Sequence, residues 1–136
     1  MMMTTIFNNA TEISILLFLC ITFAQSGIDK IIDWEGNLSW LKSHFKKTIF
    51  KTSIPLLLGI LIVLEMASGL LSALGIVKLV LDGTQTIALY AALFSVFSFL
   101  LLLLGQRIAK DYDGARTIAI YFIPAVFLLF LLQHGT

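Results

Sequence analysis

The longest apolar stretch of the chain, residues 54–80, limits the possible fold more than any other feature of the sequence. A helix rises about 1.5 Å per residue, so about 20 residues cross a hydrocarbon core of about 30 Å, and this stretch is long enough to do so. Glu65 lies near its middle, where a carboxylate that faces lipid costs at least about 2.5 kcal/mol. We therefore expect a membrane-spanning helix whose Glu65 side chain faces other helices.

The small and polar residues of this stretch share one face of the expected helix. Ser68, Gly69, Ser72 and Gly75 follow Glu65 at helical spacing, whereas leucine and valine occupy the other faces. Small residues on one face allow the backbone of a second helix to come close. We expect these four residues to be helix-packing positions, and this helix to lie at the centre of a bundle.

The composition agrees with a chain whose main solvent is lipid. Apolar residues make up 59% of the sequence and charged residues 12%, whereas a soluble domain has about 25% charged residues. Further apolar spans cover about 11–28, 86–108 and 117–133, and within the 54–80 stretch the helix is expected over about 54–78. We predict an all-α polytopic membrane protein with one domain, residues 1–136, and four transmembrane helices in an antiparallel bundle.

Residues 29–53 are the one long polar stretch, and they have the pattern of an amphipathic helix. Apolar side chains from Trp34 to Ile49 recur at steps of three or four residues, although we expect Gly36 and Asn37 to break the start of the helix. Such a segment lies in the headgroup plane with its lysines toward anionic lipid; a docking helix for a partner protein is the alternative, and the two are compatible. The expected interfacial residues are Trp34, Trp40, Phe45, Lys42, Lys46 and Lys47.

Lysine and arginine are distributed unequally between the two sides of the expected bundle. Eight of the nine lie in residues 29–53 or between 106 and 116, and the remaining one is Lys78. Basic loops stay in the cytoplasm by the positive-inside rule. We therefore predict that the loops between helices 1 and 2 and between helices 3 and 4 are cytoplasmic, and that both termini are outside.

With that orientation, several polar side chains meet in the cytoplasmic half of the bundle. Two interpretations are open. In one, Glu65 is protonated or hydrogen-bonds to Gln25, Tyr121 or a serine, and it determines which helix faces meet. In the other, the cluster lines a pocket for a polar headgroup, a quinone ring or a proton, because an acid inside a membrane is a functional candidate. The candidate pocket residues are Glu65, Gln25, Lys30, Arg107, Asp111 and Tyr121.

Three members of this cluster also have simpler roles. Arg107 and Asp111 are four residues apart, the spacing of a surface ion pair that contributes little stability. Lys30 and Arg107 also have stems long enough to extend their charges to lipid phosphates.

The cysteine and histidine content restricts the chemistry that this chain can perform. Cys20 is the one cysteine, so an intrachain disulfide is excluded. His44 lies in the polar stretch and His134 near the end of the sequence, so no intramembrane pair of histidines can ligate a haem, and no Cys/His cluster has metal-site spacing. We expect no metal site and no catalytic residues, and a protein that is not catalytic on its own. The net charge of +1 gives no indication of a nucleic-acid partner.

Two short motifs stand at the end of the first span and in the middle of the second. They are residues 23–30 (FAQSGIDK) and residues 64–69 (LEMASG), and they resemble the first and second helices of the DoxX-like family of small four-helix membrane proteins. The polar connection after the third span and the proline in the fourth resemble that family too. The long, basic, tryptophan-containing 29–53 segment departs from the family pattern. The positions that match the motifs are Gly27, Lys30, Glu65 and Gly69.

The resemblance implies a location and a class of function. DoxX-like proteins belong to the membranes of bacteria and archaea, and the family takes its name from a subunit of a thiosulfate:quinone oxidoreductase. We expect a protein of the bacterial cytoplasmic membrane that anchors or stabilises a larger membrane complex. Its partners would be the lipid bilayer and other membrane subunits or a second copy.

Two other functions are open. The first is a quinone-linked redox subunit with its pocket near Glu65. No cofactor is evident from the sequence, and a quinone is the one that this alternative would use. The other is a small transporter or lipid-binding protein that uses the same pocket.

Overall fold

The structure is a computed structural model that describes residues 2–134. This part of the chain is helical without any strand, which confirms the predicted all-α class. Four of the helices (α2, α4, α5 and α6) are long and apolar enough to cross a membrane, and they pack against one another. The helices are α1 (Met2–Asn8), α2 (Ala10–Ile32), α3 (Trp34–His44), α4 (Ile54–Asp82), α5 (Thr86–Ile108) and α6 (Tyr112–His134).

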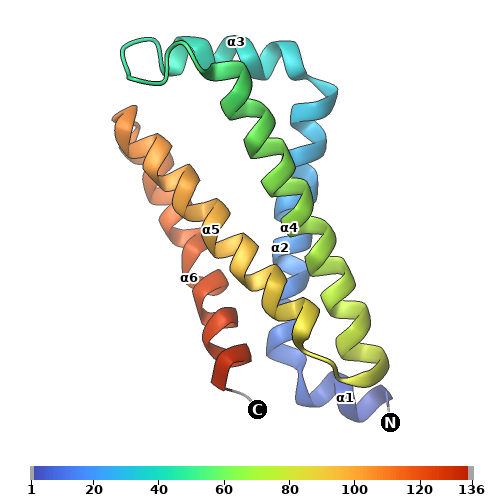
Figure 1. The fold of residues 1–136 in the computed structure, drawn as a ribbon. Helices are drawn as coiled ribbons and strands as arrows, with labels where there is room; N and C mark the ends of the chain where they lie inside the picture. Colours follow the sequence, from blue (N-terminus) through green and yellow to red (C-terminus); the bar gives the residue numbers. More distant parts are fainter. Residues whose placement is uncertain (1, 135–136) are drawn as a thin grey trace.

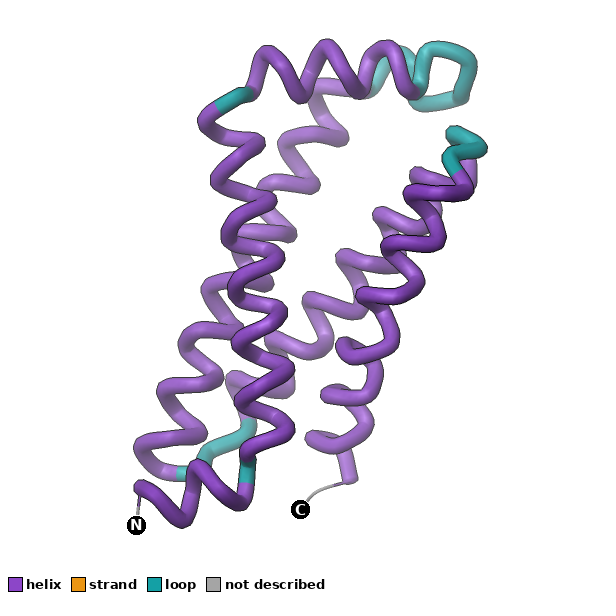
Figure 2. The backbone as a smooth tube through the Cα atoms, turned by 180° about the vertical axis from the view of Figure 1, so that it is seen from behind, coloured by secondary structure: helices purple, strands orange, loops and turns teal. Residues whose placement is uncertain are grey.

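Helix α4 is the central element of the bundle. It packs against α2 and α5, and it also contacts α1 and α3. Helix α5 packs against α6, and α6 returns to contact α2. Successive long helices run antiparallel, so both ends of the described chain lie at one end of the bundle (Figure 1). Helix α3 lies across the opposite end (Figure 2).

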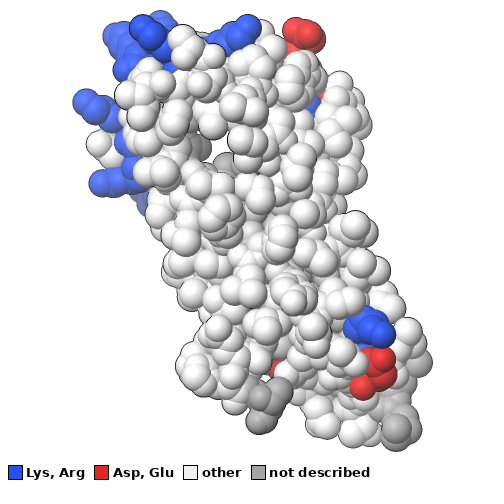
Figure 3. Space-filling model, in the orientation of Figure 1, with Lys and Arg blue, Asp and Glu red and all other residues white. Residues whose placement is uncertain are grey.

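Charged side chains gather at the two ends of the bundle. On the face drawn in Figure 3, lysine and arginine crowd the end that carries α3, a smaller group of charges lies at the other end, and the surface between them is uncharged. A surface with an uncharged middle and charged ends matches the chemistry of a bilayer, which has a hydrocarbon core between two polar layers. The charge distribution agrees with the multi-pass character of the four long helices.

The face of α4 that carries the small residues is buried within the chain. Ser68 and Ser72 are fully buried, and the hydroxyl oxygens of Ser68 and Ser98 lie 3.3 Å apart. Leucine and valine side chains on the opposite face of α4 are exposed. The small residues therefore pack against neighbouring helices, and the large apolar residues point away from the bundle.

The two buried glycines of this face contact different helices. A Cβ atom on Gly69 would lie 3.1 Å from the backbone nitrogen of Ala24 in α2. A Cβ atom on Gly75 would lie 3.0 Å from the Cα atom of Ala88 in α5. Gly69 and Gly75 thus allow α2 and α5, respectively, to approach the backbone of α4 closely.

Two helix starts differ from the sequence-based predictions. The prediction that Gly36 and Asn37 break the helix is wrong, because the Asp33 side chain accepts a hydrogen bond from the Gly36 N–H at 3.2 Å and caps α3. Helix α6 begins at Tyr112 rather than near 117, because the Asp111 carboxylate accepts the Gly114 N–H at 3.0 Å. Polar residues that favour loops on average thus start helices when their side chains satisfy the first free N–H groups.

The ends of α3 and the first residues of the chain differ as well. Helix α3 ends at His44, so Phe45 and Ile49 lie in the turns that lead to α4. Residues 2–8 form the short helix α1, which packs against α4 and was not expected from the sequence.

Candidate functional site

Lys30 of α2 and Glu65 of α4 form an ion pair inside the bundle. The Lys30 Nζ atom lies 3.0 Å from Glu65 Oε1, and the side chains are 18% and 3% exposed, respectively. Lys30 Nζ also donates a hydrogen bond to Ser26 Oγ at 2.6 Å. Among the described residues, no hydrogen-bond donor of good geometry reaches Oε1. The ammonium charge is therefore what compensates the buried carboxylate.

A close contact between α2 and α4 brings this pair together. A Cβ atom on Gly27 would lie 2.6 Å from the Met66 sulfur and 3.6 Å from the Glu65 Cβ atom. Gly27 is fully within the interface, one helical turn before Lys30, and Gly69 lies one turn after Glu65. The absence of side chains at the two glycines allows the long Lys30 side chain to reach Glu65 from the neighbouring helix.

His44, Gln106 and Asp111 form a second polar cluster, where α3 meets α5. The His44 Nε2 atom lies 3.0 Å from Gln106 Oε1 and 3.5 Å from Asp111 Oδ2. The imidazole stacks on the Trp40 ring, with 4.3 Å between the ring centroids. These contacts attach the end of α3 to the end of α5 and to the turn before α6.

A cavity of about 310 Å³ lies beneath α3, between α4 and α5. Its polar lining residues are Lys30, Asn37, His44 and Gln106, and most of its remaining wall is leucine, isoleucine and phenylalanine. The hollow is visible below the upper edge of the molecule in Figure 3. Lining residues of α4 and α5 such as Ile60 and Leu104 are exposed on the outer surface, so the cavity opens between these helices. It has the amphipathic character of a site for a molecule with an apolar chain and a polar head.

The structure brings together two of the six residues predicted to form a polar pocket, Lys30 and Glu65. Of these two, Lys30 lines the cavity, whereas Glu65 is not one of its lining residues. Gln25 is exposed, on another face of α2. Tyr121 packs its ring against Phe18 and Phe99, at centroid distances of 5.8 and 6.1 Å.

The remaining two predicted residues lie at the end of α5. The Arg107 guanidinium lies over the Tyr112 ring, 4.8 Å from its centroid. Asp111 pairs with His44 rather than with Arg107 among the described residues. The expected ion pair required a helix that continues through Asp111, and α5 ends at Ile108.

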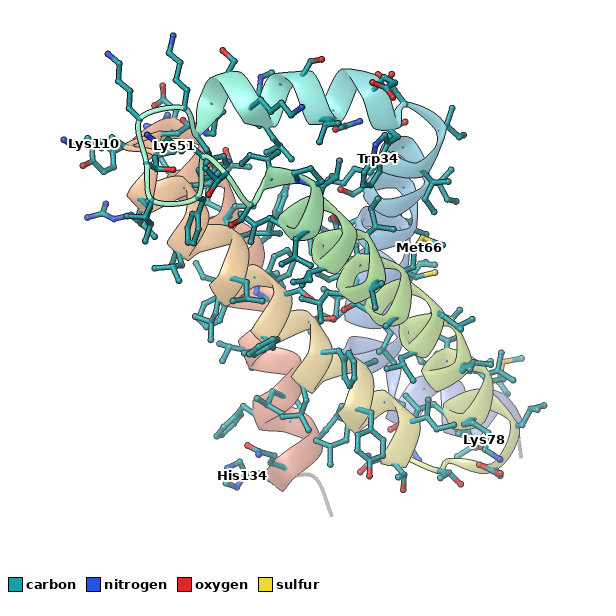
Figure 4. All side chains as sticks on the ribbon, turned by 45° about the horizontal axis from the view of Figure 1, so that its top comes forward. Trp34, Lys51, Met66, Lys78, Lys110 and His134 are labelled. Carbon is teal, nitrogen blue, oxygen red and sulfur yellow. The ribbon has the colours of Figure 1, made fainter. Side chains whose placement is uncertain are left out.

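The interfacial residues predicted from the sequence lie along α3 and just after it. Trp34 is half-buried and Trp40 is 55% exposed, while the side chains of Lys42, Lys46 and Lys47 are exposed. Figure 4 shows that Lys51 and Lys110 lie at this end of the molecule, and that Lys78 and His134 lie at the other.

His44 and Gln106 are the site residues that the sequence analysis did not select. They are 62 positions apart, and neither belongs to a recognisable motif. The amphipathic periodicity of residues 34–49 includes Phe45 rather than His44, so the pattern selects Phe45 and leaves His44 unselected.

Residues 2–134 contain no group of three or more His, Cys, Asp or Glu side chains that could hold a metal ion. The arrangement can bind an amphipathic molecule through hydrogen bonds from Lys30, His44 and Gln106. No family model, no curated protein and no solved structure matches this chain. The resemblance to the DoxX-like family therefore stays a prediction.

Proposed function

We propose that this protein is an accessory subunit of the bacterial cytoplasmic membrane that anchors or stabilises a larger membrane complex and is not catalytic on its own. The observation that carries the proposal is the Lys30–Glu65 pair. An acid that relays protons or acts as a general acid or base must gain and lose a proton during function. The Glu65 carboxylate instead lies against a fixed ammonium group in a tight α2–α4 contact, which favours a role in assembling the bundle.

The positions that match the DoxX-like motifs support the family resemblance. Two of them, Gly27 and Lys30, belong to α2, and the other two, Glu65 and Gly69, belong to α4. All four lie in the contact between these helices. They act there as one packing unit, with two glycines beside an ion pair. A shared packing unit is what would be expected of an accessory subunit that is not catalytic on its own.

The distribution of basic residues supports the proposed orientation. The α3 segment and the 109–111 turn lie at one end of the bundle, and Lys78 lies at the other (Figure 4). In the proposed topology the α3 end is cytoplasmic and both termini are outside. Helix α3 then lies at the level of the headgroups, which are the preferred surroundings of its two tryptophans and of the lysines between residues 42 and 51.

A quinone-linked redox subunit is the second candidate, and the cavity favours it. Lys30, His44 and Gln106 bring N–H donors to an otherwise apolar cavity that opens between α4 and α5. A quinone has two carbonyl oxygens that accept hydrogen bonds and an apolar tail. The cavity therefore has the chemistry to hold one.

Purification of the protein from native membranes in a mild detergent distinguishes the two candidates. Mass spectrometry identifies the proteins and the small molecules that accompany it. We expect stoichiometric membrane subunits with no quinone, both for the wild type and for Glu65→Gln. A bound quinone would place the redox function first, and a protein that purifies alone would contradict the accessory role.

A further inference from the structure

A second hollow, of about 320 Å³, lies beside the apolar cavity on the other side of His44, which lines both. Its wall is polar and basic: Lys46 and Lys47 come from the turns after α3, and Lys110 comes from the turn between α5 and α6. Ser43 and Thr48 add hydroxyl groups. Two segments that are far apart in the sequence thus bring three ammonium groups to one small hollow.

No ion pair within residues 2–134 compensates the charge of the lysines in this hollow. None of the three lysines forms an ion pair in the part of the chain that the structure describes, and all three are exposed. The nearby Asp111 carboxylate is engaged by His44 and by the Gly114 N–H. Three like charges that share a hollow repel one another, and an anion that binds there relieves this repulsion.

The turn that carries Lys110 is held in a specific shape. Lys110 adopts a positive φ of 60°, which a lysine rarely does. Two hydrogen bonds to the last turn of α5 hold the chain around it. The Lys110 N–H donates to the Arg107 carbonyl oxygen at 3.1 Å, and the Asp111 N–H donates to the Gln106 carbonyl oxygen at 2.9 Å. The turn therefore keeps Lys110 beside the 46–47 segment instead of extending the chain away from it.

From these two neighbouring spaces we propose that the protein binds one anionic glycerophospholipid. Its phosphate headgroup occupies the basic hollow, and an acyl chain passes His44 into the apolar cavity between α4 and α5. The ligand is an anionic lipid and not a quinone, because a neutral ring has no need of three lysines. The inference rests on one part of the proposed function, namely that the α3 end lies at the headgroup level of a membrane.

Native mass spectrometry of the full-length protein in detergent tests this site. The probes are phosphatidylglycerol, which is anionic, and phosphatidylethanolamine with the same acyl chains, which is zwitterionic. We expect phosphatidylglycerol to bind at least about tenfold more tightly, because the lysines of the hollow attract its net negative headgroup and a zwitterionic headgroup carries no net charge. The triple variant Lys46→Gln/Lys47→Gln/Lys110→Gln should lose this preference.

A matched control removes the same charge from the same end of the molecule. The variant Lys42→Gln/Lys51→Gln/Arg116→Gln alters three exposed cations that do not line the hollow, and it should keep the preference. The variant Leu57→Trp fills the apolar cavity and should weaken the binding of both lipids while the lysines remain. Thermal unfolding in the same detergent identifies any variant that is not folded.

Three results would overturn the proposal. The first is equal binding of the two lipids by the wild type, and the second is an equal loss of the preference for phosphatidylglycerol in the triple variant and its control. The third is displacement of phosphatidylglycerol by a neutral isoprenoid quinone that binds equally well with and without the three lysines. The accessory role fails separately, when no subunit accompanies the protein from native membranes. The two experiments therefore distinguish a protein that binds lipid but has no partner subunits from a protein that has partner subunits but no lipid site.

Discussion

At the scale of single residues, the energetics of this protein depend on how Glu65 is compensated. A buried ion pair has a desolvation cost that is close to its Coulombic gain, so the pair as a whole adds little stability. Removal of one partner has a much larger effect, because it leaves a charge without compensation in a medium of low polarity. Lys30 reaches Glu65 from a neighbouring helix, so this penalty couples α2 to α4.

The variant Lys30→Met should therefore destabilise the protein by about 3 kcal/mol, and Lys30→Met/Glu65→Leu should recover most of that loss. Denaturant unfolding in detergent, followed by circular dichroism, measures both. Lys78→Met is the control, because Lys78 pairs with Asp82 at an exposed position and its loss should leave the unfolding midpoint unchanged. Equal stability of the single and double variants would show that the pair does not couple the helices.

At the scale of helices, the structure depends on how closely α4 approaches its neighbours. Membrane helices gain little from the hydrophobic effect once they are in lipid, so packing between backbones contributes much of their association. Gly69 and Gly75 allow this approach on two sides of α4, toward α2 and α5. Gly59 lies on the same helix, yet a Cβ atom there would meet no other atom within 4 Å.

This difference predicts opposite results for the same substitution. Gly75→Ala should destabilise the bundle by about 1–3 kcal/mol, because the added methyl group meets the backbone of Ala88, which cannot move aside without shifting α5. Gly59→Ala should be neutral or slightly stabilising. Unfolding midpoints of the two variants in one detergent provide the comparison, and a loss of similar size in both would contradict the assignment of the Gly75→Ala effect to close packing against α5.

At the scale of the whole molecule, the arrangement of charges relates the fold to a membrane. The four long helices leave the α3 segment and the 109–111 turn at one end and both ends of the described chain at the other. The cavity and the basic hollow lie at the α3 end, where an ordered headgroup layer would meet them. The proposed lipid site and the proposed topology thus share one premise, which is that the α3 end of the bundle lies at a headgroup layer of the membrane.

Cysteine labelling of intact cells tests that premise. In a Cys20→Ser background, a membrane-impermeant maleimide should modify Lys78→Cys from outside and should modify Lys51→Cys only after the cells are opened. The expectation follows from the positive-inside rule and from the opposite positions of the two lysines. The reverse pattern would place α3 outside the cell and invert the topology.

Local patterns in the sequence were sufficient to identify the four long helices and the inner face of α4. Hydropathy determines which segments cross a membrane, and helical spacing determines that Ser68, Gly69 and Ser72 share a side with Glu65, because both properties depend on neighbours within a few turns. The start of α3 was predicted wrongly, since the average preferences of Gly36 and Asn37 were outweighed by one capping hydrogen bond from Asp33.

The partners of the polar residues depended on the arrangement of whole helices. The sequence allowed Gln25, Tyr121 or a serine as the partner of Glu65, and the structure selects Lys30 because the rotation of α2 turns that side chain inward and leaves Gln25 exposed. His44 and Gln106 meet because α3 crosses the bundle above the end of α5. Helix rotation and crossing result from the packing of many distant residues together, so no local spacing in the chain encodes them.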